Sequence, residues 1–233
     1  MLISGIQQCT LLDFPGKTAC VVFTPGCNFR CGYCHNPEFV LPEQIKHIQK
    51  NFIHEDVFFH FLEKRKGLLD GVVITGGEPT LQGDLIPFMK KIRNLGFLIK
   101  LDTNGNMPQV LTKVLEEKLI DYIAMDIKTS YLKYQSLVGK RAQTNFLQES
   151  ISLIMHSGIP YEFRSTIIKE THTQHILKEM ADMITGANIF ALQSFRPGHT
   201  LNPLYKTFHA YSHEEMIAIK KIFEPHAKHV IIR

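Results

Sequence analysis

Three cysteines that could bind one metal centre lie close together near the start of the sequence. Cys27, Cys31 and Cys34 occur in the run Thr24-Pro-Gly-Cys-Asn-Phe-Arg-Cys-Gly-Tyr-Cys-His-Asn-Pro37. One tight loop can therefore aim three thiolates at one point, and soft thiolates suit an iron–sulfur cluster. A [4Fe–4S] cluster held by three cysteines leaves one iron open, and an open metal position is where a substrate can bind.

Spacing alone leaves other uses of these cysteines open. Cys31-Gly-Tyr-Cys34-His35 matches the attachment site of c-type haem, but that use needs an exported chain and leaves Cys27 without a role. A zinc site would need a fourth ligand, for which His35 is available. A disulfide framework is disfavoured, because five cysteines without a visible export signal imply a reducing compartment.

The composition is that of an ordinary globular chain. The 233 residues are 44% hydrophobic, which fits a single domain over residues 1–233. A net charge of +4 is too mild for a nucleic-acid-binding signature, and no apolar run approaches the roughly 20 residues of a membrane helix. We therefore expect a cytoplasmic protein that binds neither nucleic acid nor membrane. The remaining cysteines, Cys9 and Cys20, are expected to have no chemistry.

Short β-rich runs alternate with amphipathic stretches along the chain. The predicted strands are Ala19–Thr24, Gly71–Thr75, Phe97–Asp102, Tyr122–Ile127, Tyr161–Ile168 and Asn188–Gln193, with His229–Arg233 as one more candidate. The predicted helices are His54–Lys66, Gly83–Asn94, Pro108–Glu117, Thr144–Ser157, Thr173–Thr185 and His213–Phe223. This alternation implies an α/β fold with a parallel sheet. About six βα units are too few for a closed eight-stranded barrel, so we predict an open partial (β/α)6 barrel.

A glycine-rich motif follows the second predicted strand. In Thr75-Gly-Gly-Glu-Pro79, the pair Gly76 and Gly77 would let the backbone approach a ligand closely, and Glu78 adds an anionic group. The carboxyl ends of the strands are where ligands gather in such folds. A tight strand-to-helix turn is the alternative, since both dipeptides are ordinary turn formers.

Polar groups also end the third and fourth predicted strands. Asp102, Thr103 and Asn104 offer oxygen ligands to a ribose hydroxyl, an amine or a hard cation, although an Asx-type turn would use the same residues. Asp126 and Lys128 share one face because side chains alternate along a strand. The alternative for that pair is a plain ion pair.

Polar residues of the fifth and sixth predicted strands are further candidates. Arg164 alternates with apolar neighbours, and an arginine that points inward needs an anion. That anion could be a cofactor carboxylate or a partner peptide, or a structural partner such as Glu162 or an acidic neighbour. Gln193 ends the sixth predicted strand, Arg196 follows it, and they are the nearest polar candidates there.

The cysteine motif resembles the signature of the radical S-adenosylmethionine (radical SAM) superfamily. Tyr33 before the last cysteine and His35-Asn36-Pro37 after it are similar to the glycyl-radical-enzyme activases. Within them, Asp13-Phe-Pro-Gly16 followed by the stretch from Phe23 to Pro37 most resembles the activating proteins of anaerobic ribonucleoside-triphosphate reductase. The resemblance extends from Asp13 to about Gly198.

The resemblance implies cofactors and the residues that hold them. It implies a [4Fe–4S] cluster on the three cysteines and S-adenosylmethionine on the open iron, and in such activases the two aspartates, here Asp102 and Asp126, can also contribute to a monovalent cation site. No catalytic side chain is expected beyond the cluster and the cofactor. The expected cofactor-binding residues are Tyr33, His35, Gly76, Gly77, Glu78, Asp102, Thr103, Asn104, Asp126, Lys128, Arg164, Gln193 and Arg196.

The resemblance also implies a reaction and its partners. A reduced flavodoxin or ferredoxin would deliver one electron, S-adenosylmethionine would be cleaved to methionine and a 5′-deoxyadenosyl radical, and that radical would take a hydrogen atom from the substrate. In activases the substrate is a backbone glycine of a large partner enzyme, here anaerobic ribonucleotide reductase. The alternatives are a radical SAM enzyme acting on another peptide or a small molecule, and a non-enzymatic zinc or electron-transfer protein.

Overall fold

The computed structural model describes residues 1–233, and the chain forms two compact units. Unit 1 consists of Met1–Asn28, Asn36–Thr103 and Met107–Ile123. Unit 2 consists of Phe29–His35, Asn104–Asn106 and Ala124–Arg233. The single domain expected from composition stays a prediction.

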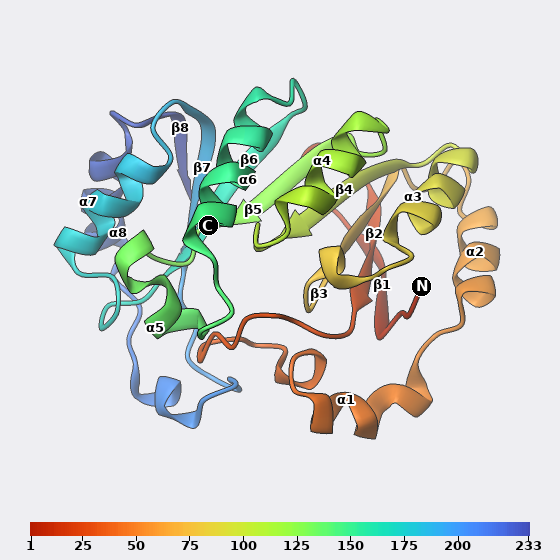
Figure 1. The fold of residues 1–233 in the computed structure, drawn as a ribbon, viewed down its shortest axis with the longest axis horizontal. Helices are drawn as coiled ribbons and strands as arrows, with labels where there is room; N and C mark the ends of the chain where they lie inside the picture. Colours follow the sequence, from red (N-terminus) through yellow and green to blue (C-terminus); the bar gives the residue numbers. More distant parts are fainter. The chain divides into compact units, whose positions relative to one another are not determined.

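The strands occur in the sheet in the same order as in the sequence. They are β1 (Gly5–Thr10), β2 (Ala19–Thr24), β3 (Gly71–Gly76), β4 (Leu98–Thr103), β5 (Tyr122–Asp126), β6 (Tyr161–Ile167), β7 (Ala187–Ser194) and β8 (Ala227–Ile232) (Figure 1). Strand β1 pairs antiparallel with β2, whereas β2–β3, β3–β4, β6–β7 and β7–β8 are parallel pairs. The sheet is mixed and open, with β1 and β8 as its edges, which confirms the predicted fold class.

Helices alternate with the strands as the sequence predicts. They are α1 (Pro42–Ile48), α2 (Glu55–Glu63), α3 (Leu85–Asn94), α4 (Pro108–Glu116), α5 (Tyr134–Val138), α6 (Thr144–His156), α7 (Gln174–Met183) and α8 (His213–Phe223). The sequence did not predict α1 and α5, which are short. None of the helices has the length and apolar character that a membrane crossing requires.

The core of unit 1 is built by the inward faces of its strands. Ala19 and Val21 of β2 pack with Val73 of β3, with Phe14 and with Tyr122. The aromatic-rich helix α2 packs on α3, where the rings of Phe58 and Phe88 stack at 5.4 Å. Helix α3 ends at Asn94, and Gly96 just beyond it has a φ of +91°, a conformation that glycine adopts without strain.

Unit 2 is built on the parallel pairing of β6, β7 and β8. Phe190 of β7 is fully buried, and its ring stacks on that of Phe223 of α8 at 4.5 Å. Burying a side chain of this size stabilises the fold by about 1.5–3 kcal/mol. Helix α8 begins with a capping box, in which Ser212 and Glu215 each bond the backbone N–H of the other.

Candidate functional site

The glycine motif after β3 packs directly on the start of the cysteine loop within unit 1. The backbone N–H of Gly77 donates to the carbonyl of Thr24 at 2.7 Å, and that of Glu78 donates to Gly26, also at 2.7 Å. A Cβ atom on Gly77 would lie 2.0 Å from the carbonyl oxygen of Gly26, which leaves no room for a side chain. Gly76 has a φ of +120°. The motif is thus a tight turn, and its glycines hold two strand ends together.

Glu78 lies beside this turn and is only 1% exposed. Its Oε1 atom accepts hydrogen bonds from the backbone N–H of Thr80 at 3.1 Å and from the Thr80 hydroxyl at 2.5 Å. The hydroxyl of Thr103, at the end of β4, donates to the same oxygen at 2.8 Å. Two of the predicted site residues, Glu78 and Thr103, therefore meet.

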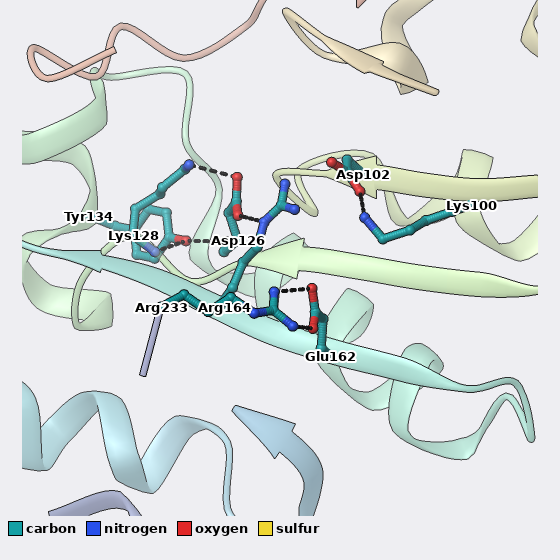
Figure 2. Close-up of polar contacts among 8 residues, drawn as sticks. All are labelled: Lys100, Asp102, Asp126, Lys128, Tyr134, Glu162, Arg164 and Arg233. Atoms are coloured by element: carbon teal, nitrogen blue, oxygen red, sulfur yellow. Dashed lines mark hydrogen bonds and ion pairs between the residues drawn. The ribbon is translucent and has the colours of Figure 1, made fainter. Parts of the chain in front are cut away.

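Asp102 of β4 forms a buried ion pair that the sequence reading missed. Its carboxylate bonds the ammonium of Lys100, a residue that is 1% exposed (Figure 2). The spacing in the sequence could have predicted this pair, because Lys100 precedes Asp102 by two residues and side chains two apart share one face of a strand. Asp102 is thus available to a ligand only together with its lysine.

In unit 2, one carboxylate at the end of β5 joins two cations. Asp126 accepts a hydrogen bond from Lys128 Nζ at 2.8 Å and another from Arg164 Nε at 2.5 Å (Figure 2). Burial disfavours its charged form, yet the charges of Arg164 and Lys128 hold the pKa of Asp126 well below its usual range. The same attraction outweighs burial for Lys128, whose pKa is raised. Three predicted residues therefore form one charged cluster, as the ion-pair alternative expects.

Glu162, the acidic residue of β6, pairs with an arginine other than Arg164. Both carboxylate oxygens of Glu162 bond the guanidinium of Arg233, at 3.0 and 2.7 Å. The acidic neighbour that the sequence left open for Arg164 is thus Asp126. Tyr134 of α5 fixes the end of β5, because its hydroxyl oxygen accepts the N–H of Lys128 at 3.0 Å.

The second half of the cysteine loop, Phe29–His35, lies in unit 2. Burial raises the pKa of the Cys31 thiol to about 11. Tyr33 is 4% exposed and its hydroxyl has no hydrogen-bond partner in the protein. Lys128 Nζ lies 6.0 Å from the centre of the Tyr33 ring. An unpartnered buried hydroxyl beside a cation fits a polar ligand, since buried polar groups are normally hydrogen-bonded.

The remaining predicted residues make contacts of other kinds. Asn104 accepts the backbone N–H of Asn106 at 3.0 Å, which is the Asx-type turn that the sequence allowed. His35 is exposed, and its Nδ1 donates to the carbonyl of His199 at 3.2 Å. Gln193 is half-buried near the end of β7, and Arg196 is exposed beyond it.

Comparisons with known proteins agree with this architecture. The sequence pattern of the Radical SAM superfamily matches residues 21–184. MJ1227 of Methanocaldococcus jannaschii, provisionally named a glycyl-radical enzyme activating enzyme, is 32% identical over the whole chain and 95% of its own length. The pyruvate formate-lyase-activating enzyme of Clostridium pasteurianum is 28% identical over 85% of this chain and 82% of its own.

A solved structure shares the fold. SuiB of Streptococcus suis, with S-adenosylmethionine bound, matches 91% of this chain and 51% of its own with a TM-score of 0.64 and 15% identity. That likeness concerns the fold alone, whereas the superfamily match and the full-length relative concern the sequence itself. The chain belongs to the radical SAM superfamily and, within it, to the glycyl-radical-enzyme activating enzymes.

Proposed function

We propose that this activating enzyme generates a glycyl radical on anaerobic ribonucleoside-triphosphate reductase. The observation that carries the choice of partner is the run Asp13-Phe-Pro-Gly16, which resembles the activating proteins of that reductase. Phe14 of this run is 3% exposed and packs 6.2 Å from the ring of Tyr122, so the motif is a folded part of unit 1. The relative from C. pasteurianum makes pyruvate formate-lyase the second candidate partner.

The superfamily uses a [4Fe–4S] cluster and S-adenosylmethionine, and these are the cofactors of this enzyme. Cys27, Cys31 and Cys34 would hold the cluster, because none of them forms a disulfide and all three lie in one short loop. No three His, Cys, Asp or Glu side chains of the structure converge as they would on a metal ion, so the ligand set rests on the loop's sequence. The chemistry that the bound cofactors supply is one-electron cleavage to a 5′-deoxyadenosyl radical.

The chain's own residues would bind and orient the cofactor. Lys128 carries three N–H donors and gives one to Asp126, which leaves donors for a carboxylate. Its raised pKa keeps it charged at neutral pH. Glu78 would face the amino group beside the close backbone approach at Gly77, and the oxygens of Asp102, Thr103 and Asn104 would serve the ribose. Tyr33 would pack on the adenine or beside the cluster, and a monovalent cation would use Asp102 and Asp126.

The test is anaerobic reconstitution with iron and sulfide, followed by reduction and addition of S-adenosylmethionine. Reduced flavodoxin or ferredoxin is the proposed donor, and dithionite is the chemical substitute. The mixture is offered anaerobic ribonucleotide reductase or pyruvate formate-lyase, and glycyl radical and 5′-deoxyadenosine are measured.

Each outcome of this test has a definite meaning. A glycyl electron-spin signal on the reductase alone supports the proposal, and a signal on pyruvate formate-lyase alone replaces the partner. Deoxyadenosine without either signal points to another peptide or a small molecule as substrate. One tightly bound zinc without iron or sulfide would overturn the cofactor assignment.

A further inference from the structure

The segment after β7, residues 195–208, returns to the cysteine loop within unit 2. The backbone N–H of Leu201 donates to the carbonyl of Cys34 at 3.0 Å, and that of Asn202 donates to Gly32 at 2.8 Å. His35 adds a side-chain bond to the carbonyl of His199 at 3.2 Å. The loop between the last two cysteines is thus bonded to a segment that lies about 170 residues further along the chain.

The 195–208 segment is itself well fixed. The hydroxyl of Thr200 donates to the carbonyl of Asn202 at 2.9 Å, and the side chain of Asn202 accepts the N–H of Leu204 at 3.0 Å. The second bond caps a short 3-10 helix, Pro203–Thr207. This helix carries Tyr205 toward the cysteine loop.

Tyr205 fills the space where Gly32 would have a side chain. A Cβ atom on Gly32 would lie 2.3 Å from Cε2 of Tyr205, although the backbone of Gly32 is not in the positive-φ region. The Tyr205 ring is 5.9 Å from that of Tyr33 and 4.5 Å from that of Phe208, and the residue is 8% exposed. One aromatic side chain therefore covers the two residues between Cys31 and Cys34.

We propose that Tyr205 is a positioning residue for the iron–sulfur cluster and acts through Gly32 and Tyr33. The inference rests on the proposed function, because it presumes a cluster on the cysteines. Residues outside the ligand shell orient the ligands and control solvent access to a metal site. Tyr205 does both, since it sets the backbone between two ligands and covers that backbone from solvent.

The first test compares Tyr205→Ala and Tyr205→Phe with Leu204→Ala, which changes an exposed residue of the same short helix. After anaerobic reconstitution we expect Tyr205→Ala to lose iron to a chelator about tenfold faster than wild type and to alter the electron-spin spectrum of the reduced cluster. Tyr205→Phe keeps the ring and should behave as wild type, as should Leu204→Ala. Circular dichroism of each apo chain checks the fold.

A second variant tests the contact from the other side. Gly32→Ala places a methyl group against Tyr205 and should also speed iron loss. In the double variant Gly32→Ala/Tyr205→Ala this clash is absent, so its iron loss should be no faster than that of Tyr205→Ala alone. If Tyr205→Ala does not fold, Gly32→Ala carries the test.

A folded Tyr205→Ala variant with the iron release and spectrum of wild type would overturn the positioning role and leave the proposed function intact. If Tyr205→Ala does not fold, the same result in a folded Gly32→Ala variant would overturn it. A double variant that loses iron faster than Tyr205→Ala would overturn the contact between Tyr205 and Gly32. A wild-type chain that takes up no iron and sulfide would instead overturn the proposed function, and the inference with it.

Discussion

The Nε atom of Arg164 lies 2.5 Å from a carboxylate oxygen of Asp126. Lys128 bonds the other oxygen, so a single carboxylate lies between two cations in a largely buried cluster. Burial works against this charge, but the two cations keep the pKa of Asp126 low. Without the carboxylate, two cations would face each other with their compensating charge removed.

Replacement of Asp126 by Asn should therefore destabilise the apo chain by about 3 kcal/mol, the typical result of breaking a buried pair. Urea unfolding at neutral pH measures this change. The matched control is Glu117→Gln, which breaks the exposed pair of Lys90 and Glu117 and should cost less than about 1 kcal/mol. Equal losses in the two variants would contradict a structural role for Asp126.

Glu78→Gln should separate folding from cofactor binding. The three hydrogen bonds from Thr80 and Thr103 end on one oxygen, Oε1, and the glutamine amide oxygen can accept them too. We expect the free energy of unfolding to change by less than about 1 kcal/mol, whereas S-adenosylmethionine binds about tenfold more weakly because the charge is lost. Calorimetric titration of the reconstituted enzyme measures the affinity, and unchanged affinity would remove Glu78 from the binding site.

Gly77→Ala should distort the turn that follows β3 and packs on the start of the cysteine loop. Its Cβ would lie 2.0 Å from a backbone oxygen that cannot rotate away, and such overpacking typically costs about 1–3 kcal/mol. Gly83→Ala is the matched control, because nothing lies within 4 Å of its Cβ position and its φ is not positive. Chemical unfolding that ranks Gly83→Ala as the more damaging change would contradict this packing.

The buried His172 should make stability depend on pH. Burial lowers its pKa below the ordinary value of 6.5. Its Nδ1 accepts the N–H of Ile168 at 2.9 Å while Nε2 donates to the carbonyl of Lys128 at 2.9 Å, so the folded chain holds the neutral ring. A group with a lowered folded pKa contributes full stability above pH 6.5, and that contribution is lost as the pH falls from there toward the folded pKa.

We therefore expect the wild-type free energy of unfolding to fall by up to about 1.4 kcal/mol per pH unit just below this pH. His172→Gln keeps a donor for Lys128 but cannot titrate, so its curve should lack this component. Unfolding at a series of pH values gives both slopes. The same slope in both proteins would assign the effect to the other eleven histidines.

Single cysteine variants test the metal ligands. Cys27→Ala, Cys31→Ala and Cys34→Ala should each abolish formation of 5′-deoxyadenosine and lower bound iron, because these three thiolates are the proposed protein ligands of the cluster. Cys9→Ala and Cys20→Ala should keep both. Loss of activity in a well-folded Cys9→Ala chain would contradict a single three-cysteine site.

Much of the fold could be predicted from the sequence, because local signals agree with the final structure. Strand β2 and helix α8 have the bounds that were predicted, and both carry strong local signals: an apolar run from Ala19 to Thr24 and a capping box that starts at Ser212. Helix α1 was missed because none of its residues is buried, so it has no apolar stripe to detect. Helix α5 has only five residues, too few to show a helical period.

The types of residue in the candidate site could be predicted from the sequence better than the contacts between them. Strand alternation places Asp126 and Lys128 on one face, and they do form an ion pair. The partner of Arg164 could not be chosen, because Asp126 lies 38 residues away in the sequence. The role of Tyr205 was invisible for the same reason, since only the folded chain brings it to Gly32.

The ribosome synthesises the loop at Phe29–His35 long before the residues that hold it in place. Its backbone partners are Val138, Leu201 and Asn202, all of which emerge long after it. At about 5–20 residues per second, the loop waits on the order of ten seconds before Leu201 exists. During that interval its two thiols, those of Cys31 and Cys34, belong to an unfinished chain without the bonds that fix the loop. The backbone hydrogen bonds that fix this loop therefore form only after nearly the whole polypeptide has been synthesised.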